Sequence, residues 1–277
     1  MPGVTSFERG YYALQNRLLP GLRHPQYLYL DQLLELLPAG TRWLDLGCGH
    51  QILPWRMDLD EKSIVERCAL AVGADLDAGS LKNHESIRDR VLAKGEELPF
   101  PAGTFDLVTA NMVVEHVHDP SGILKEIHRV LRPGGHFLFI TPNRNSPYIR
   151  VAERTPERVK KTMVRIFERR AEADVFPTKY RMNTAADVRR FAAASGGFRV
   201  KRLEQRNSTA VTARLGPFAI PELLFLRLLQ QDRFEDLRTI LLVTLEKSQS
   251  GESLTARGGR ADGEAVGGIQ RRDPRRV

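Results

Sequence analysis

The chain has 277 residues, of which 42% are hydrophobic, and a formal net charge of +8. This composition predicts a soluble protein with a substantial core, and no apolar stretch reaches the roughly 18 residues of a membrane span. The two cysteines indicate no disulfide framework, and the charged pair Glu8-Arg9 argues against a signal peptide, so we expect a cytoplasmic protein.

Apolar spacing predicts alternating helices and strands in the first half of the chain. A leucine-rich helix over Tyr27–Leu37 should end at Pro38-Ala39-Gly40 and lead into the first strand. Strands are expected at Arg42–Leu46, Ala69–Ala74, near Arg90–Ala93 and at Phe105–Ala110, with a helix around Asp60–Arg67. Alternation of this kind favours a parallel sheet.

The second half continues with a helix over Ile123–Leu131, which Pro133-Gly134-Gly135 should stop before a fifth strand. A late helix, Thr184–Ser195, and the last two strands, Phe198–Glu204 and Thr239–Glu246, follow. An insertion, Pro142–Asn183, separates the fifth strand from the late helix.

Within the insertion, Thr155-Pro156-Glu157 predicts the start of an amphipathic helix, whose apolar face is Val159, Met163, Ile166 and Phe167. We favour two roles for this helix, a lid over a substrate pocket or a helix packed on the domain, over a contact with a membrane surface. The apolar stretch Pro217–Leu229 would cover the same pocket or pair with another subunit. The sequence does not predict the oligomeric state of the protein.

Charge is distributed unevenly. Through Thr141 the chain has 14 basic and 18 acidic residues, whereas from Pro142 onward it has 28 basic and 16 acidic residues. Three interpretations of the basic second half stay open: it binds an anionic substrate, it contacts an anionic membrane surface, or the protein is simply arginine-rich and has no charged ligand. No nucleic-acid-binding module is recognisable, so we expect no nucleic-acid partner.

The run Trp43-Leu44-Asp45-Leu46-Gly47-Cys48-Gly49-His50 precedes a second apolar run that ends in Asp75. A strand that turns on Gly-x-Gly and is followed by a strand ending in an acid is typical of adenosine-binding sheets, although any sharp turn also needs glycine. A dinucleotide fingerprint requires a small residue where Ile52 stands, and no Walker loop is present. Of the adenosine cofactors considered, S-adenosylmethionine therefore remains, and Asp75 would accept hydrogen bonds from its ribose hydroxyls.

Four further segments complete the pattern: Glu96–Pro101, Thr104–Asn111, Val113–Val117 and Leu131–Ile140. In this order they resemble the class I S-adenosylmethionine-dependent methyltransferases, especially the methyltransferase type 11-like and quinone-methyltransferase-like branch acting on small molecules. The resemblance covers roughly Tyr27–Lys247. It implies an α/β, doubly wound, Rossmann-like and mostly parallel seven-stranded sheet with an antiparallel last strand and a helical insertion between strands 5 and 6. The methyltransferase domain would span residues 1–247, with a lid at about 142–183 and a disordered basic tail at 248–277.

The same resemblance implies a cofactor site. It assigns Asp45, Gly47 and Gly49, with Cys48 between them, to the amino acid end of the cofactor, Asp75 to the ribose, Leu76 to the adenine side and Asn111 to the methionine moiety.

The sequence departs from the family pattern in two places. An Asp-Ala pair that usually binds the adenine amino group is replaced by Lys94 and Gly95, so that contact must come from backbone near Gly95, from Glu96, or be absent. Gln51 stands where a third glycine is common. Some quinone O-methyltransferases use an acid to hold magnesium where this chain has Met112, so we predict no metal.

The sulfonium is an activated donor, so the main task is to align the acceptor atom for in-line displacement. A general base is needed only for an acceptor that is protonated at neutral pH, and His116 is the candidate. The structural alternative is that Glu115-His116 begins a helix and bonds to backbone. We therefore expect methyl transfer to a small molecule, with oxygen as the acceptor atom. A catalytically silent cofactor-binding scaffold or partner subunit is the alternative.

Overall fold

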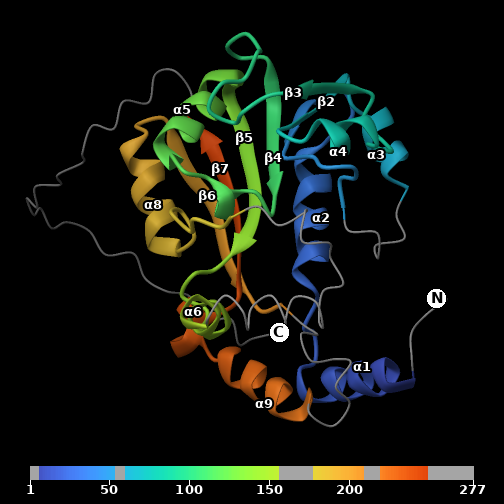
Figure 1. Ribbon diagram of the computed structural model, residues 1–277, viewed down its shortest axis with the longest axis vertical. Coiled ribbons are helices and arrows are strands. Elements are labelled where there is room, and N and C mark those ends of the chain that lie inside the picture. The colour runs from blue at the N-terminus through green and yellow to red at the C-terminus, as the bar shows by residue number, and fades with distance from the viewer. Residues whose placement is uncertain (1–5, 54–59, 156–176, 209–218, 249–277) are drawn as a thin grey trace, which may run out of the picture.

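The computed structural model describes residues 6–53, 60–155, 177–208 and 219–248, and these contain a seven-stranded sheet (Figure 1). Its order is β3-β2-β1-β4-β5-β7-β6. The strands are β1 (Arg42–Leu46), β2 (Leu70–Asp75), β3 (Asp89–Leu92), β4 (Phe105–Asn111), β5 (Leu131–Pro142), β6 (Phe198–Arg206) and β7 (Ile240–Lys247). The pairs among β1 to β5 are parallel, and β7 is antiparallel to both of its neighbours. The predicted α/β, mostly parallel seven-stranded sheet with an antiparallel last strand is confirmed, whereas the helical insertion between strands 5 and 6 stays a prediction.

Helices cover both faces of the sheet. In Figure 1, α2 (Pro25–Leu36), α3 (Glu61–Glu66) and α4 (Ala78–Lys82) lie on one side, and α5 (Pro120–Val130) and α8 (Ala185–Ala194) lie on the other. Alternate strand residues serve the two layers: Trp43 belongs to the cluster with α2, and Leu44 to the cluster with α5 and α8. The alternation follows from the pleat, which turns successive side chains to opposite faces.

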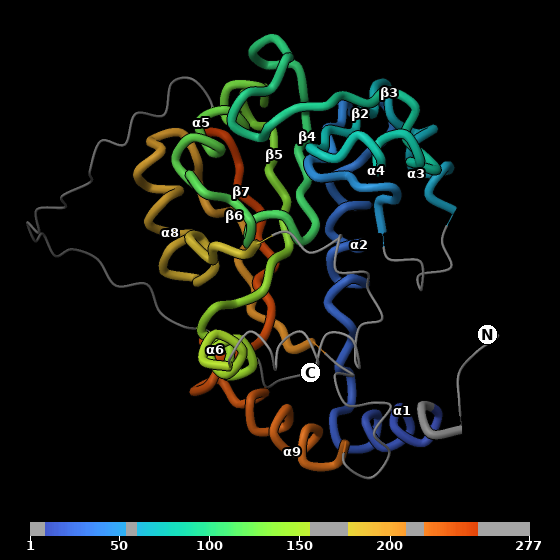
Figure 2. Tube along the Cα trace, viewed as in Figure 1, coloured from blue at the N-terminus to red at the C-terminus, as the bar shows by residue number. Residues whose placement is uncertain are grey.

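Three more helices form a cap beyond the carboxyl ends of β1, β4 and β5 (Figure 1). They are α1 (Ser6–Leu18), α6 (Pro147–Arg154) and α9 (Ala219–Leu229). Tyr11 and Leu19 pack with Leu223 and Leu226 in a separate apolar cluster, and Figure 2 shows α1 and α9 side by side. The sequence indicated the apolar stretch that contains α9 and a helical insertion in which α6 lies, but it indicated no helix at α1. No helix among the described residues has the length and apolar character to cross a bilayer.

The predicted boundaries hold to within a few residues except at β5. This strand begins at Leu131, because Leu131 pairs with Phe105 of β4 before the register shifts to the His136–Leu107 pair. Pro133-Gly134-Gly135 therefore lies in the irregular start of the strand rather than ahead of it, and Gly134 has φ 75°. Of the helix predicted to start at Thr155-Pro156-Glu157, and of the tail predicted at 248–277, the described residues include only Thr155 and Ser248.

Candidate cofactor and acceptor site

The predicted glycine turn follows β1 directly. Gly47 and Gly49 have φ 67° and 56°, a region that favours glycine, and the Gly47 amide donates to the Ala74 carbonyl of β2 at 2.7 Å. A side chain on Gly47 would collide with Val113, whereas a Cβ on Gly49 would meet open space. The turn therefore fits tightly against the protein at Gly47 and leaves room for a ligand at Gly49.

Cys48 points away from that room. Its side chain is 3% exposed, and its Sγ lies so close to Gly73 of β2 that a Cβ there would be 2.7 Å from the sulfur. Burial raises the pKa of the thiol. Only the backbone of Cys48 is thus placed to serve a ligand at the turn.

Asp75 ends β2 beside the turn. Its Oδ2 accepts a hydrogen bond from the Gly49 amide at 2.8 Å, and its Oδ1 accepts one from the Asp77 amide at 2.9 Å. An ionised carboxylate has about four acceptor positions, so each oxygen retains capacity for a hydroxyl. The adjacent Leu76 is 59% exposed, and Leu92, which pairs with Asp75 across β2 and β3, is 61% exposed. Two apolar side chains thus stand beside the carboxylate, and Leu92 was missed from the sequence.

Asp45 is 3% exposed and belongs to a buried polar chain. The Thr109 hydroxyl donates to its Oδ1 at 2.6 Å, and the Trp43 indole N–H donates to that hydroxyl at 2.8 Å. Burial raises the pKa of Asp45 to about 7, with smaller contributions in the same direction from the charges of Glu61 and Asp75. A cation nearby would oppose this rise, because it stabilises the ionised form.

Glu61, at the start of α3, is a site residue that sequence reasoning missed. Its carboxylate accepts from the amides of Ile52 and Leu53 at 3.2 and 2.9 Å, and from the Ser86 hydroxyl at 2.5 Å. These bonds hold the segment that leaves the glycine turn. The sequence signal was only an acid in the first turn of a helix, which is common without any site.

The residues predicted to lie at the adenine side belong to the turn after β3. Lys94 is exposed, and its carbonyl accepts from the Glu97 amide at 3.0 Å. A Cβ on Gly95 would lie 2.8 Å from Ile123 of α5 and 3.4 Å from Leu46 at the end of β1. Gly95 and the half-buried Glu96 therefore stand next to the glycine turn, where the backbone near Gly95 can approach a ligand.

Asn111 ends β4 and pairs with Gln26 of α2 through two amide hydrogen bonds. Gln26 Nε2 donates to Asn111 Oδ1 at 2.9 Å, and Asn111 Nδ2 donates to Gln26 Oε1 at 3.0 Å. The pair fixes the first turn of α2 at the carboxyl end of the sheet. The sequence did not indicate Gln26, because 85 residues separate the partners.

Backbone strain is concentrated at this end. Met112, directly after Asn111, has φ 57°, and Tyr180 has φ 49°; they are the two non-glycine residues with positive φ among those described. Such conformations are costly and cluster at functional sites. The Tyr180 amide donates to the Glu115 carbonyl at 3.1 Å, so both strained residues flank the short 3₁₀ helix η1 (Val114–His116).

His116 lies at the end of η1. Its Nδ1 is 3.3 Å from the Pro177 carbonyl, and its amide donates to the Val113 carbonyl. The contacts of His116 with backbone carbonyls are those that we expected if this residue has a structural rather than a catalytic role. When Nδ1 donates to that carbonyl, Nε2 becomes the acceptor nitrogen of the neutral ring.

Glu115, beside it, is buried and linked to β5. The Thr141 hydroxyl donates to Glu115 Oε2 at 2.8 Å, and Asn183 Nδ2 donates to the same hydroxyl at 2.7 Å. Burial raises the pKa of Glu115. These hydrogen bonds join η1, β5 and the segment before α8, and thereby fix the position of His116.

Metal binding was predicted to be absent. The described residues contain no group of three or more His, Cys, Asp or Glu side chains suited to a metal ion. Since that search covers only part of the chain, the absence of a metal stays a prediction.

A family model described as a methyltransferase domain matches residues 22–176. Ubiquinone biosynthesis O-methyltransferases are similar: that of Acinetobacter baumannii (strain AYE) is 34% identical over 116 residues, covering 39% of this chain and 46% of the relative. That of Pseudomonas syringae pv. tomato is 37% identical over 123 residues, covering 42% and 50%. The chain thus spans about half the length of these curated relatives.

Solved structures share the fold. An S-adenosylmethionine-dependent methyltransferase from Mesorhizobium loti matches with a TM-score of 0.50 and 22% identity, covering 78% of this chain and 96% of that one. Geranyl diphosphate C-methyltransferase from Streptomyces coelicolor matches with a TM-score of 0.50 and 15% identity, covering 89% and 85%. The expected methyltransferase family agrees with the family model and with the curated relatives. The family model covers more than half of the chain, and the protein belongs to the methyltransferase domain family.

Proposed function

We propose that this protein binds S-adenosylmethionine at the glycine turn and transfers its methyl group by in-line displacement to a small-molecule acceptor, with oxygen as the acceptor atom. The observation that carries the proposal is the set of three carboxylates around the turn, those of Asp45, Glu61 and Asp75. S-adenosylmethionine carries a sulfonium and an ammonium, which these carboxylates attract. A dinucleotide pyrophosphate would be repelled.

In this proposal each cofactor group has a residue. Asp45, with the backbone of Gly47, Cys48 and Gly49, takes the amino acid end. The remaining acceptor positions of Asp75 take the ribose hydroxyls, and Leu76 with Leu92 lies along the adenine. Gly95 and Glu96 border its edge, and Asn111 lies near the methionine moiety.

The acceptor would bind beyond the end of β4, next to Met112 and η1. The matches to ubiquinone biosynthesis O-methyltransferases support an oxygen acceptor. His116 Nε2 would take the proton of a hydroxyl during methyl transfer, and the Glu115–Thr141–Asn183 chain would position it.

Calorimetric titration with S-adenosylmethionine and with its demethylated product tests the cofactor assignment. We expect binding of both, and far weaker binding of NAD. Failure to bind S-adenosylmethionine at millimolar concentration would contradict the proposal. A second assay uses a methyl-labelled donor and a pool of small metabolites, with mass spectrometry of the labelled products. Binding without any turnover would favour the silent scaffold.

A further inference from the structure

A cavity of about 330 Å³ lies between the cap, the end of β6 and the start of β7, apart from the glycine turn. Its volume is within the range of small-ligand pockets. Its lining includes Arg23 before α2, the three residues Gln205, Arg206 and Asn207 at the end of β6, Gln230 after α9, and Arg238 before β7.

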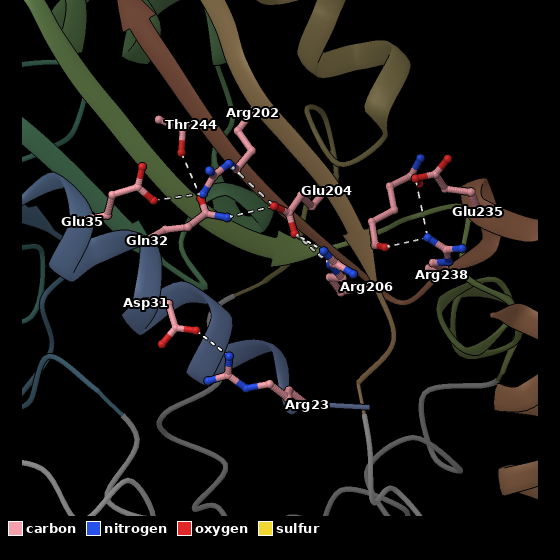
Figure 3. A network of polar contacts seen from close by, with 11 residues as sticks. Arg23, Asp31, Gln32, Glu35, Arg202, Glu204, Arg206, Glu235, Arg238 and Thr244 are labelled. Atoms are coloured by element: carbon pink, nitrogen blue, oxygen red, sulfur yellow. Dashed lines mark hydrogen bonds and ion pairs between the residues drawn. The ribbon is translucent and has the colours of Figure 1, made fainter. Parts of the chain in front are cut away.

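The polar groups of this lining are cationic or neutral. Three guanidinium groups, from Arg23, Arg206 and Arg238, come from three separate parts of the chain (Figure 3). The other polar side chains are amides, and no carboxylate is among the lining residues. Guanidinium groups match carboxylates and phosphates in charge and geometry, so the lining favours an anion.

Arg23 and Arg206 are held in place without using all their donors. Arg206 donates through Nε and Nη2 to Glu204 at 2.8 and 2.6 Å, and Arg23 donates through Nη1 to Asp31 at 2.6 Å. A guanidinium has five N–H donors, so both side chains retain capacity for a ligand.

Arg238 has a different role. It donates through Nε, Nη1 and Nη2 to the carbonyls of Leu229, Gln205 and Gln230. It lies 3.6 Å from the carboxylates of both Asp232 and Glu235, so its charge is compensated and it forms part of the wall. It also holds the ends of β6 and α9 together.

The cavity is close to the proposed acceptor site. Arg23 precedes Gln26 by three residues, and Gln26 is bonded to Asn111 at the end of β4. Three residues span at most about 10 Å of extended chain. A ligand group at Arg23 can therefore belong to the same small molecule as an atom beside Asn111. Arg206 and Arg238 also come from the part of the chain after Pro142, where cations are in excess.

We propose that this cavity binds an anionic group of the methyl acceptor, a carboxylate or a phosphate, remote from the atom that is methylated. The inference rests on the proposed function, because it assigns the substrate class of the same site. Arg23 and Arg206 provide the hydrogen bonds to the anion, and Arg238 shapes the cavity.

The test is calorimetric titration of the full chain with inorganic pyrophosphate and with citrate, in the presence of saturating S-adenosylmethionine. Arg23→Gln and Arg206→Gln remove the proposed contacts, and both side chains are about half exposed, so the core stays intact. Arg199→Gln is the matched control: Arg199 lies at the other end of β6 and pairs with Glu246 at 3.0 Å.

We expect one anion to bind per chain, with affinity lowered at least about fivefold in Arg23→Gln and Arg206→Gln and unchanged in Arg199→Gln. Binding of pyrophosphate alone would identify a phosphate site, and binding of citrate alone a carboxylate site. If neither anion binds, or if all three variants lose affinity equally, the inference is wrong. S-adenosylmethionine affinity, measured separately, should not change in any variant, and a loss confined to Arg23→Gln or Arg206→Gln would contradict the inference. Absence of S-adenosylmethionine binding to the unmodified protein would contradict the proposed function instead.

Discussion

The hydroxyl of Thr109 on β4 donates a 2.6 Å hydrogen bond to the buried carboxylate of Asp45 on β1. The same hydroxyl accepts from the Trp43 indole, so one threonine satisfies two buried polar groups. The bond also opposes the rise in the pKa of Asp45 that burial causes. The protonation state of Asp45, the proposed cofactor-binding acid, thus depends on a residue of the neighbouring strand β4.

Thr109→Val should lower the free energy of unfolding by about 1 to 3 kcal/mol, because it leaves buried partners unpaired. It should also weaken S-adenosylmethionine binding, because the pKa of Asp45 rises further. Thr244→Val is the control, since Thr244 is buried and donates to Gln32 at 3.1 Å, outside the glycine turn. Urea unfolding and calorimetry at pH 7.5 should show that both variants lose stability and only Thr109→Val loses cofactor affinity. Equal affinities in the two variants would count against the role of Asp45.

Affinity for S-adenosylmethionine should increase as pH rises through about 7. The pKa of Asp45 is raised to about 7 in the free protein, and the cofactor's positive charges favour its ionised form. Binding below pH 7 must therefore release a proton, which calorimetry in buffers of different ionisation enthalpy detects. Asp45→Asn should bind weakly and show a flat profile between pH 6 and 8. A wild-type profile equally flat would show that Asp45 stays ionised throughout.

Asp45→Asn should also increase stability at alkaline pH. A carboxyl whose pKa is higher in the folded state binds more protons there than in the unfolded chain, so ionising it as pH rises from about 4 to 7 reduces stability. The asparagine variant avoids that loss, which should be on the order of a few kcal/mol. Urea unfolding at pH 5 and pH 8 measures it: the advantage of the variant should appear at pH 8 and shrink at pH 5. An advantage that is the same at both values would not come from ionisation.

Gly47→Ala should destabilise the fold by more than the backbone strain alone, because the added methyl group also collides with Val113. Gly103→Ala isolates the strain, since Gly103 has φ 68° and open space around it. Strain of this kind costs about 1 to 2 kcal/mol, and the collision should add a further ~1 to 3 kcal/mol. Thermal unfolding compares the two variants, and cofactor titration should show loss only in Gly47→Ala. Equal melting temperatures would mean that Val113 moves aside freely.

His116→Ala should reduce kcat by about 10² to 10⁴ if the acceptor is a hydroxyl, while affinity for S-adenosylmethionine stays unchanged. His118→Ala serves as the control, because His118 is exposed two residues further along. The assay uses the labelled product identified from the metabolite pool. An equal kcat in His116→Ala and His118→Ala would contradict the role of His116 as the base.

Local patterns in the sequence accounted for most of the sheet. The first strand was predicted with the bounds Arg42–Leu46, which the structure also has, because it is bounded by a glycine before it and the Gly47 turn after it. Leu131 was assigned to a helix because its apolar spacing continues that of Ile127 and Val130. Pairing with Phe105 places it at the start of β5 instead, since hydrogen bonding to a neighbouring strand overrides local spacing.

The sequence by itself determined the alternation of strands and helices, the glycine turn and the acid that follows it at Asp75, because periodicity and backbone dihedral preferences act between near neighbours. Only the tertiary structure decided that Glu61 holds the exit of the turn, that Gln26 pairs with Asn111, and that Arg23 and Arg206 line one cavity. These residues come together because helices pack on a sheet whose order differs from chain order, and no local pattern encodes that packing.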